Sequence, residues 1–207
     1  MKFSYVSAVA AMALAAALAG CGGKAQFTVQ GTVSGLNNSG LVLANGGSTV
    51  TVPAGATTFA FPQQIDYGTE FNITVQTNPA HMTCGVVSGG TGSAGYTVSI
   101  QAQVSCVQNS YTLGGQFTGL KAKADGTART VTLLNGSAGG AILVSSVNGD
   151  ANGAGNFVFA SNVADGATYG VTVVPDTASD VVCTLVNGTG VMHEAAVSNL
   201  LLTCVPK

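Results

Sequence analysis

The sequence contains two copies of one pattern, and this duplication restricts the fold to one that a segment of about 80 to 95 residues can form by itself. Residues 27–36 recur at 111–120, 59–61 at 157–159, and 68–75 at 166–173. Each copy continues through a first cysteine, a Gly-Thr-Gly sequence and a final segment that ends in a second cysteine. We therefore expect two homologous domains, at 27–106 and 111–207, joined by a linker at 107–110.

The second copy is longer than the first. The offset between the copies is 84 at residue 27 and 98 at Phe59, so the second copy has 98 − 84 = 14 additional residues. They fall around Lys121–Arg129 and around Val147–Gly155. Insertions are tolerated far better in exposed turns than inside strands, so we predict that both segments are surface loops.

Within each copy, apolar residues alternate with polar ones, as in 71–75 and 169–173. This period of two is typical of a half-buried antiparallel strand. Asn-Gly pairs at 45–46, 135–136 and 187–188 are typical of hairpin turns. Only 7% of the residues are charged and 29 are glycine, which favours short strands and many turns over amphipathic helices. The sequence thus predicts an all-β chain with two tandem small antiparallel β-sandwich domains, but it does not fix the order of the strands.

The motifs of the two copies resemble those of a known group of repeats. The shared order is Gly-Leu-Val-Leu at 40–43, then Phe-x-Phe, an aromatic-x-Val/Ile-Thr-Val strand, a cysteine, Gly-Thr-Gly and a final strand that ends in a cysteine. It is similar to the tandem immunoglobulin-like or prealbumin-like β-sandwich repeats of proteobacterial cell-envelope lipoproteins. The second copy departs from the pattern at 131–136 and in its longer loops. The resemblance implies an architectural module and no catalytic residues.

The first 20 residues have the order of a secretory signal peptide. Lys2 precedes an uncharged apolar run at 3–19, and Leu18-Ala19-Gly20-Cys21 matches the lipobox of bacterial lipoproteins. We expect cleavage before Cys21, diacylation of its thiol and a short lipidated tether at 21–26, so that membrane lipid is the first partner of the chain. The alternative, a transmembrane helix, would need about 20 apolar residues. Gly22 in place of an aspartate resembles lipoproteins of the outer membrane, so the expected location is the cell envelope, lipid-anchored at the outer membrane.

Four cysteines remain after Cys21, in a compartment where disulfides persist. They allow three pairings. Because a duplicated domain would carry its own crosslink, the repeat selects Cys84–Cys106 and Cys183–Cys204. A redox or metal site is the alternative. Neither copy has Cys-x-x-Cys, and His81 and His193 occupy different places relative to their cysteines, so we expect no cofactor and no metal site there.

Sequence motifs for catalysis are absent. There is no Gly-x-Ser-x-Gly, and a triad would have to use one of the two histidines. The carboxylate pairs lie in turns, where aspartate commonly accepts a hydrogen bond from the backbone: Asp66 with Glu70, and Asp176 with Asp180. We therefore expect no catalytic residues and no enzyme.

Two further segments are considered as binding sites, one for calcium and one for nucleic acid. Asn148, Asp150 and Asn152 place oxygen atoms as the start of a calcium loop does, but the twelfth position is Phe159 and not glutamate, so the ligand set is incomplete. Turn chemistry explains these residues without an ion, and they are a weak calcium candidate only. Lys121, Lys123 and Arg129 are the only basic cluster, with Asp125 among them, so nucleic acid is not an expected partner.

Two functions remain as hypotheses. The first is a non-catalytic envelope lipoprotein that displays two immunoglobulin-like domains as a structural or adhesive element, with an envelope or surface protein as partner. The second is a ligand-binding module, for a glycan or a protein, that uses the inserted loops of the second domain. Tyr67 and Tyr96 are the aromatic residues expected in exposed turns, and tryptophan is absent.

Overall fold

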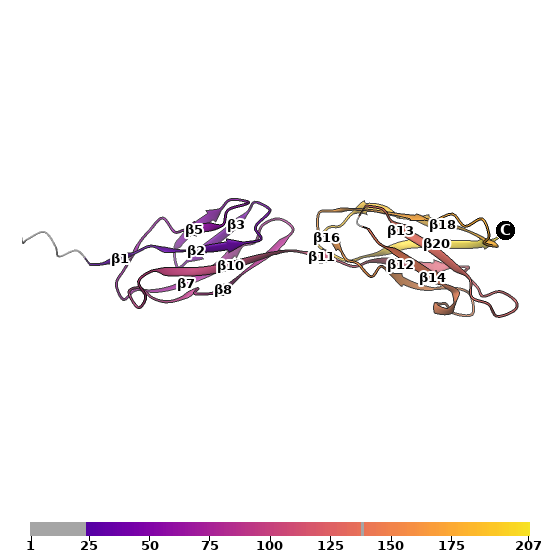
Figure 1. Ribbon diagram of the computed structural model, residues 1–207, viewed down its shortest axis with the longest axis horizontal. Coiled ribbons are helices and arrows are strands. Elements are labelled where there is room, and N and C mark those ends of the chain that lie inside the picture. The colour runs from indigo at the N-terminus through magenta and orange to yellow at the C-terminus, as the bar shows by residue number, and fades with distance from the viewer. Residues whose placement is uncertain (1–23, 138) are drawn as a thin grey trace, which may run out of the picture. The chain divides into compact units, whose positions relative to one another are not determined.

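The computed structural model of the chain describes residues 24–137 and 139–207 (Figure 1). The predicted signal peptide at 1–20 and the predicted lipidation site Cys21 lie outside the described residues. The chain divides into two compact units. The first consists of the residues up to Asn78 together with Cys84–Ser105, and the second of Pro79–Thr83 together with Cys106–Lys207. Residues 107–110, predicted as a linker, carry the end of one strand and the start of the next.

The first unit is a sandwich of two four-stranded sheets. One sheet has the order β5-β2-β10-β8, with bounds Thr58–Ala60, Val29–Ser34, Ile100–Gln108 and Met82–Ser88. The other has the order β4-β3-β7-β9, with bounds Ser48–Val52, Leu41–Asn45, Glu70–Thr77 and Thr91–Ser93. Two further short strands, β1 (Gln26–Phe27) and β6 (Ile65–Asp66), pair with each other in a separate antiparallel sheet.

The second unit repeats this arrangement strand for strand. Its sheets have the orders β15-β12-β20-β18, with bounds Gly155–Val158, Leu113–Thr118, Val197–Pro206 and Val181–Val186, and β14-β13-β17-β19, with bounds Ala141–Ser145, Thr130–Asn135, Thr168–Val173 and Thr189–Val191. The small pair is β11 (Ser110–Tyr111) with β16 (Val163–Ala164). The predicted all-β fold is confirmed, and the sequence repeat is a repeat of topology.

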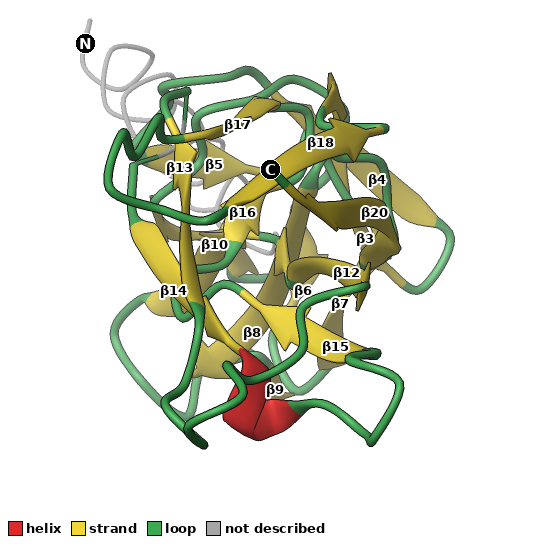
Figure 2. Ribbon diagram, turned by 90° about the vertical axis from the view of Figure 1, so that its right-hand side faces the viewer, coloured by secondary structure: helices red, strands yellow, loops and turns green. Residues whose placement is uncertain are grey.

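Helix is nearly absent from the described part of the chain. Within residues 24–137 and 139–207, helical structure is limited to one 3-10 turn, η2 (Ser146–Asn148), drawn in red in Figure 2. No helix among these residues has the length and apolar character that crossing a membrane requires.

In each unit one of the two sheets also contains a parallel pair of strands, which the sequence did not predict. In each unit the first long strand lies parallel to the last one: β2 pairs with β10, and β12 pairs with β20. Alternation of apolar residues reports which face of a strand is buried and carries no information on the direction of its neighbour. The remaining pairings with a determined register are antiparallel.

A glycine occupies the equivalent position in each parallel pair. Gly31 lies opposite Ala102, and Gly115 lies opposite Leu200. A Cβ built on Gly31 would overlap the Ala102 carbonyl, and one on Gly115 would overlap the Leu200 carbonyl. The backbones can approach this closely only because glycine has no side chain.

The inner faces of the sheets form one apolar core in each unit. In the second unit it includes Leu113, Phe117, Leu133, Leu200 and Leu202, all at most 1% exposed. The repeated Phe-x-Phe motif contributes the same packing twice. The rings of Phe59 and Phe61 meet edge to face with centroids 6.1 Å apart, and those of Phe157 and Phe159 are 6.5 Å apart. Such aromatic pairs add to the stability that burial provides.

The cysteines are disulfide-bonded as the repeat predicted, Cys84 with Cys106 and Cys183 with Cys204. Cys183 and Cys204 are direct cross-strand partners on β18 and β20, with Cα atoms 4.1 Å apart. Closing a loop of 21 residues stabilises the fold by about 3 kcal/mol in the chain-entropy model.

Substitution of the glycine in the parallel pair should destabilise the second unit. We expect Gly115→Ala to lower the free energy of unfolding by about 2–3 kcal/mol, because the new methyl group forces the β12 and β20 backbones apart. Denaturant unfolding measures this change. Gly85→Ala is the matched control, since a Cβ there meets nothing within 4 Å, and its effect should stay within about 0.5 kcal/mol. Equal effects of the two substitutions would contradict the close approach.

Candidate functional site

The first inserted loop, 121–129, joins β12 to β13 and is fixed by Arg129. The guanidinium makes a two-pronged contact with Asp180, with Nε donating to Oδ1 at 2.9 Å and Nη2 donating to Oδ2 at 2.7 Å. Its Nη1 donates to the carbonyl oxygens of Lys121 and Ala122, at 2.9 and 3.0 Å. Arg129 therefore connects the inserted loop to the segment before β18, and it is committed to these partners.

The ion pair shifts the titration of its carboxyl group. The hydrogen bonds from Arg129 lower the pKa of Asp180 to about 2. At the tip of the same loop, Asp125 accepts a hydrogen bond from the backbone N–H of Thr127, which lowers the pKa of Asp125. These carboxylates stabilise the shape of the loop.

The second inserted loop contains the incomplete calcium motif. Asp150 Oδ1 accepts hydrogen bonds from the backbone N–H groups of Asn152 and Ala154, at 2.8 and 2.9 Å. The bond from Ala154 is the largest cause of the lowered pKa of Asp150. The carboxylate oxygen thus closes a turn, as the alternative interpretation of Asn148, Asp150 and Asn152 expects. The described residues 24–137 and 139–207 contain no group of three His, Cys, Asp or Glu side chains placed to hold a metal ion.

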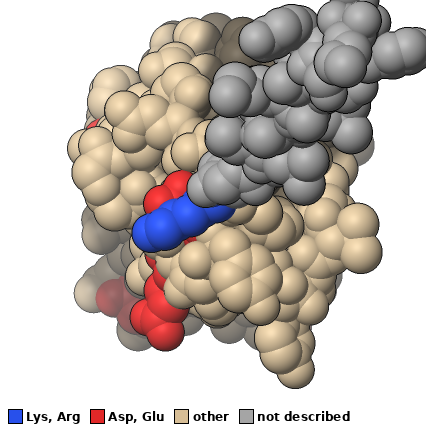
Figure 3. Space-filling view, turned by 90° about the vertical axis from the view of Figure 1, so that its left-hand side faces the viewer, with Lys and Arg blue, Asp and Glu red and all other residues tan. Residues whose placement is uncertain are grey.

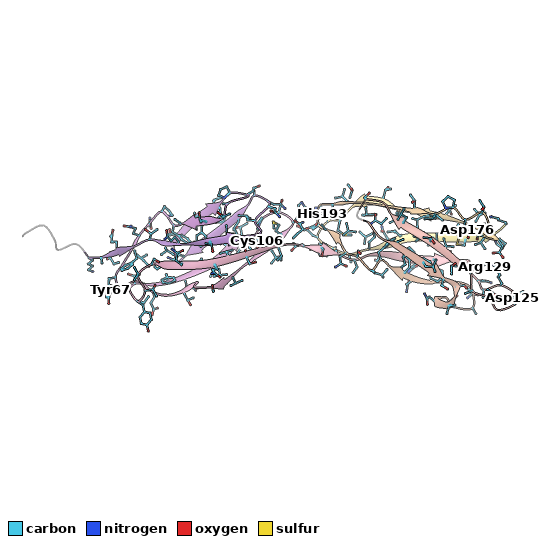
Figure 4. The ribbon with its side chains drawn as sticks, viewed as in Figure 1. Tyr67, Cys106, Asp125, Arg129, Asp176 and His193 are labelled. Carbon is cyan, nitrogen blue, oxygen red and sulfur yellow. A yellow bond between two sulfur atoms is a disulfide. The ribbon has the colours of Figure 1, made fainter. Side chains whose placement is uncertain are left out.

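A pocket of about 500 Å³ opens beside the first inserted loop. Its walls come from β13, the end of β17 with the segment that follows, β18 and the C-terminal Lys207. Aliphatic side chains such as Val131 and Val181 line it together with polar ones such as Thr130 and Asp176. Arg129 and Asp180 flank it in the sequence, since they adjoin the lining residues Thr130, Ser179 and Val181. Figure 4 shows that Asp125, Arg129 and Asp176 lie at one end of the second unit, whereas His193 lies at the other.

The two exposed aromatic residues lie where the sequence predicted them, in turns. Tyr67 is 67% exposed and Tyr96 is 93% exposed. The Tyr67 ring lies 6.4 Å from that of Phe27, and a Cβ on Gly95 would overlap it, so Tyr67 packs against the residue that precedes Tyr96. Figure 3 shows a face of the molecule on which few charged side chains lie among uncharged ones.

The carboxylate pairs serve as local hydrogen-bond acceptors. Asp66 accepts from the Gln26 side chain at 3.3 Å, and Asp176 accepts from the Ala178 backbone N–H at 2.9 Å. Asp180 is held by Arg129 and not by Asp176.

The fold assembles one cluster that the sequence did not indicate. His81, in the Pro79–Thr83 segment of the second unit, has its Nδ1 3.1 Å from Oδ2 of Asp165, whose side chain is fully buried. The His81 and His193 rings stand edge to face with centroids 6.4 Å apart. The backbone N–H of Glu194 donates to Asp165 Oδ1 at 2.9 Å, and this bond is the largest cause of the lowered pKa of Asp165.

Comparison with known proteins does not assign a family. No protein-family model matches the chain, and no curated protein matches it. Similar solved structures include the major pilin protein T-13 from Streptococcus pyogenes, 11% identical over 89% of this chain and 98% of that chain, with a TM-score of 0.30. They also include the shaft pilin SpaA from Lactobacillus rhamnosus GG, 12% identical over 87% and 98% of the two chains, with a TM-score of 0.31. These scores are too low to support an argument about function.

The Arg129–Asp180 ion pair should make the second unit sensitive to acid. The pKa of Asp180 is lowered in the folded chain from 3.8 to about 2, so the stabilisation is present above pH 3.8 and is lost as the pH falls toward 2. We expect Asp180→Asn to lower the melting temperature at pH 6 and to have a much smaller effect near pH 2, where the folded-state carboxyl group is half protonated. Glu70→Gln, in the first unit, is the control. A melting-temperature difference between Asp180→Asn and the wild type that does not change with pH would contradict the ion pair as its cause.

Proposed function

We propose that the chain is a non-catalytic lipoprotein of the bacterial cell envelope, anchored through Cys21 and displaying two β-sandwich units. The observation that carries this proposal is the equivalence of the two units. The two sandwiches have the same strand order and the same parallel pairing between first and last long strands, and both copies of the repeat have disulfide-bonded cysteines. A duplicated, internally crosslinked module whose polar side chains serve local turns is suited to structural or adhesive display.

The anchor is the part of the proposal that rests on sequence. The lipobox at 18–21 directs acylation to the Cys21 thiol, and two or more acyl chains give stable attachment, since each buried methylene contributes about 0.8 kcal/mol. Gly22 supports forwarding to the outer membrane. The partner of the displayed units would then be an envelope or surface protein.

Labelling of intact cells tests the anchor. We expect the wild-type chain to incorporate labelled palmitate and the Cys21→Ala variant to incorporate none. Protease added to the same cells reports the side of the outer membrane: digestion indicates surface display, and protection until the membrane is breached indicates a periplasmic scaffold. Label that persists in Cys21→Ala would overturn the lipoprotein proposal.

A second candidate function is ligand binding by the inserted loops. It is favoured because hydrogen bonds hold both loops in one conformation. Arg129 fixes the first loop and Asp150 closes the second, so little conformational entropy would be lost when a ligand binds. The pocket beside the first loop provides a concave surface with aliphatic and polar walls for part of a glycan or protein ligand.

Exchange of loops between the copies tests this second candidate. Replacing residues 147–154 with the shorter 54–57 of the first copy removes the second loop and retains Ser146, which hydrogen-bonds the Arg129 backbone. If the loop binds ligand, we expect loss of binding on a glycan array with an unchanged melting temperature. A second variant, with 37–40 in place of 121–130, tests the other loop. Binding retained by both variants would exclude the loops as the site.

A further inference from the structure

The chain has two histidines, and folding brings them together. His81 comes from the segment between β7 and β8, and His193 from the turn after β19, both in the second unit. Their rings are in edge-to-face contact at 6.4 Å. The two are not equivalent positions of the repeat, so the duplication alone does not explain their meeting.

Each imidazole has a carboxylate near the same nitrogen atom. Nδ1 of His81 is 3.1 Å from Asp165 Oδ2, and Nδ1 of His193 is 4.0 Å from Glu194 Oε2. A carboxylate near Nδ1 favours the tautomer that carries the proton there and leaves the lone pair on Nε2. This pairing of histidine with a carboxylate is the usual surrounding of a metal-binding imidazole.

The Asp165–His81 contact is close but not satisfied. Asp165 Oδ2 and His81 Nδ1 are both buried, and although they lie within hydrogen-bonding distance they are not aligned as a hydrogen bond. Buried polar atoms in this condition are costly. A cation on Nε2 would make the Nδ1–H a stronger donor and would strengthen its attraction to the negative charge of Asp165.

The backbone at the cluster is strained. His81 and Glu194 have φ angles of 63° and 52°, and in the described residues only Asn187 shares this left-handed conformation among residues other than glycine. Asn187 lies in an Asn-Gly turn, where asparagine tolerates it. Strained backbone of this kind is concentrated at functional sites. Gly166 lies against the His81 ring, where a Cβ would approach Nε2 to 3.1 Å, so glycine leaves room for the ring in this position.

We propose that His81 and His193 together bind one divalent transition-metal ion through their Nε2 atoms, with Asp165 and Glu194 orienting the two imidazoles. With metal–nitrogen distances of about 2.0–2.1 Å, two imidazoles on one ion have ring centroids from about 4.5 Å apart when they are cis to about 6.4 Å when they are trans. The observed 6.4 Å is the separation of a trans pair, and a cis pair would need the His193 ring to move closer. The His193 side chain is 74% exposed, so it can rotate toward the ion, whereas buried Asp165 restrains His81.

The ligands of the site determine which metal ion it prefers. No third His, Cys, Asp or Glu in the described residues completes a metal-binding group, so water fills the other positions and the ion stays open to exchange. Imidazole ligands suit Cu²⁺, Ni²⁺ and Zn²⁺, and Cu²⁺ is held most tightly in the general order of affinities. The two carboxylates give the cluster a negative charge that favours a cation. This proposal is independent of the lipid anchor.

Titration of the purified full chain with Cu²⁺ tests the site, with calorimetry for the stoichiometry and electron paramagnetic resonance for nitrogen ligands. We expect one equivalent with a two-nitrogen signature, lost in both His81→Ala and His193→Ala. Asp165→Asn should weaken binding about 10- to 100-fold. Glu70→Gln, which removes a carboxylate from the first unit, should leave binding unchanged. Repeating the titration on Cys21→Ala distinguishes Cu²⁺ bound by the histidines from Cu²⁺ bound by a free Cys21 thiol.

Folding and metal binding can be distinguished in the same series. His193 is largely exposed, so His193→Ala should keep the wild-type melting temperature without added metal, and Cu²⁺ should raise that temperature only in the chain with both histidines. Absence of saturable binding in the wild type would overturn the proposal. Undiminished binding in a folded His193→Ala chain would do so as well.

Discussion

The parallel pairing between the first and last long strands of each unit is the constraint on which the rest of the fold depends. β2 lies along β10, and β12 lies along β20, each through a glycine that permits close contact. Parallel neighbours cannot be joined by a tight turn. The chain between them must therefore leave the sheet and build the opposite one before it returns. Two sheets and a single enclosed core follow from this requirement in both copies.

Much of this architecture is predictable from the sequence because it repeats. Alternation located the strands around Ile73 and Val171, and the shared cysteine positions gave the disulfides. Asn45 and Asn135 also have a role that their Asn-Gly pairs only partly reveal. Each side-chain oxygen accepts a backbone N–H from the neighbouring strand, at 2.9 and 3.0 Å. The parallel pair was missed, since alternation does not encode the direction of a neighbouring strand.

The histidine cluster lay beyond sequence reasoning for a different reason. Comparison of the copies asks whether equivalent positions carry the same residue, and His81 and His193 fail that test. The fold nevertheless brings them together beside buried Asp165, which follows the short strand β16 and contacts His81 and the backbone of Glu194. A site built from non-equivalent segments leaves no signature in a repeat. By contrast, the turn that Asp150 closes is a local structure, an Asx turn, which sequence spacing describes well.

The parallel closure also has a mechanical consequence. When the two ends of a unit are pulled apart along its strands, the chain enters at the start of the first strand and leaves at the end of the last. Because these strands are parallel neighbours, the six paired positions between β2 and β10 are loaded in shear and share the force. A hairpin pulled at its open end would instead lose its hydrogen bonds one after another. Each unit therefore resists tension along its strands through hydrogen bonds that are loaded together.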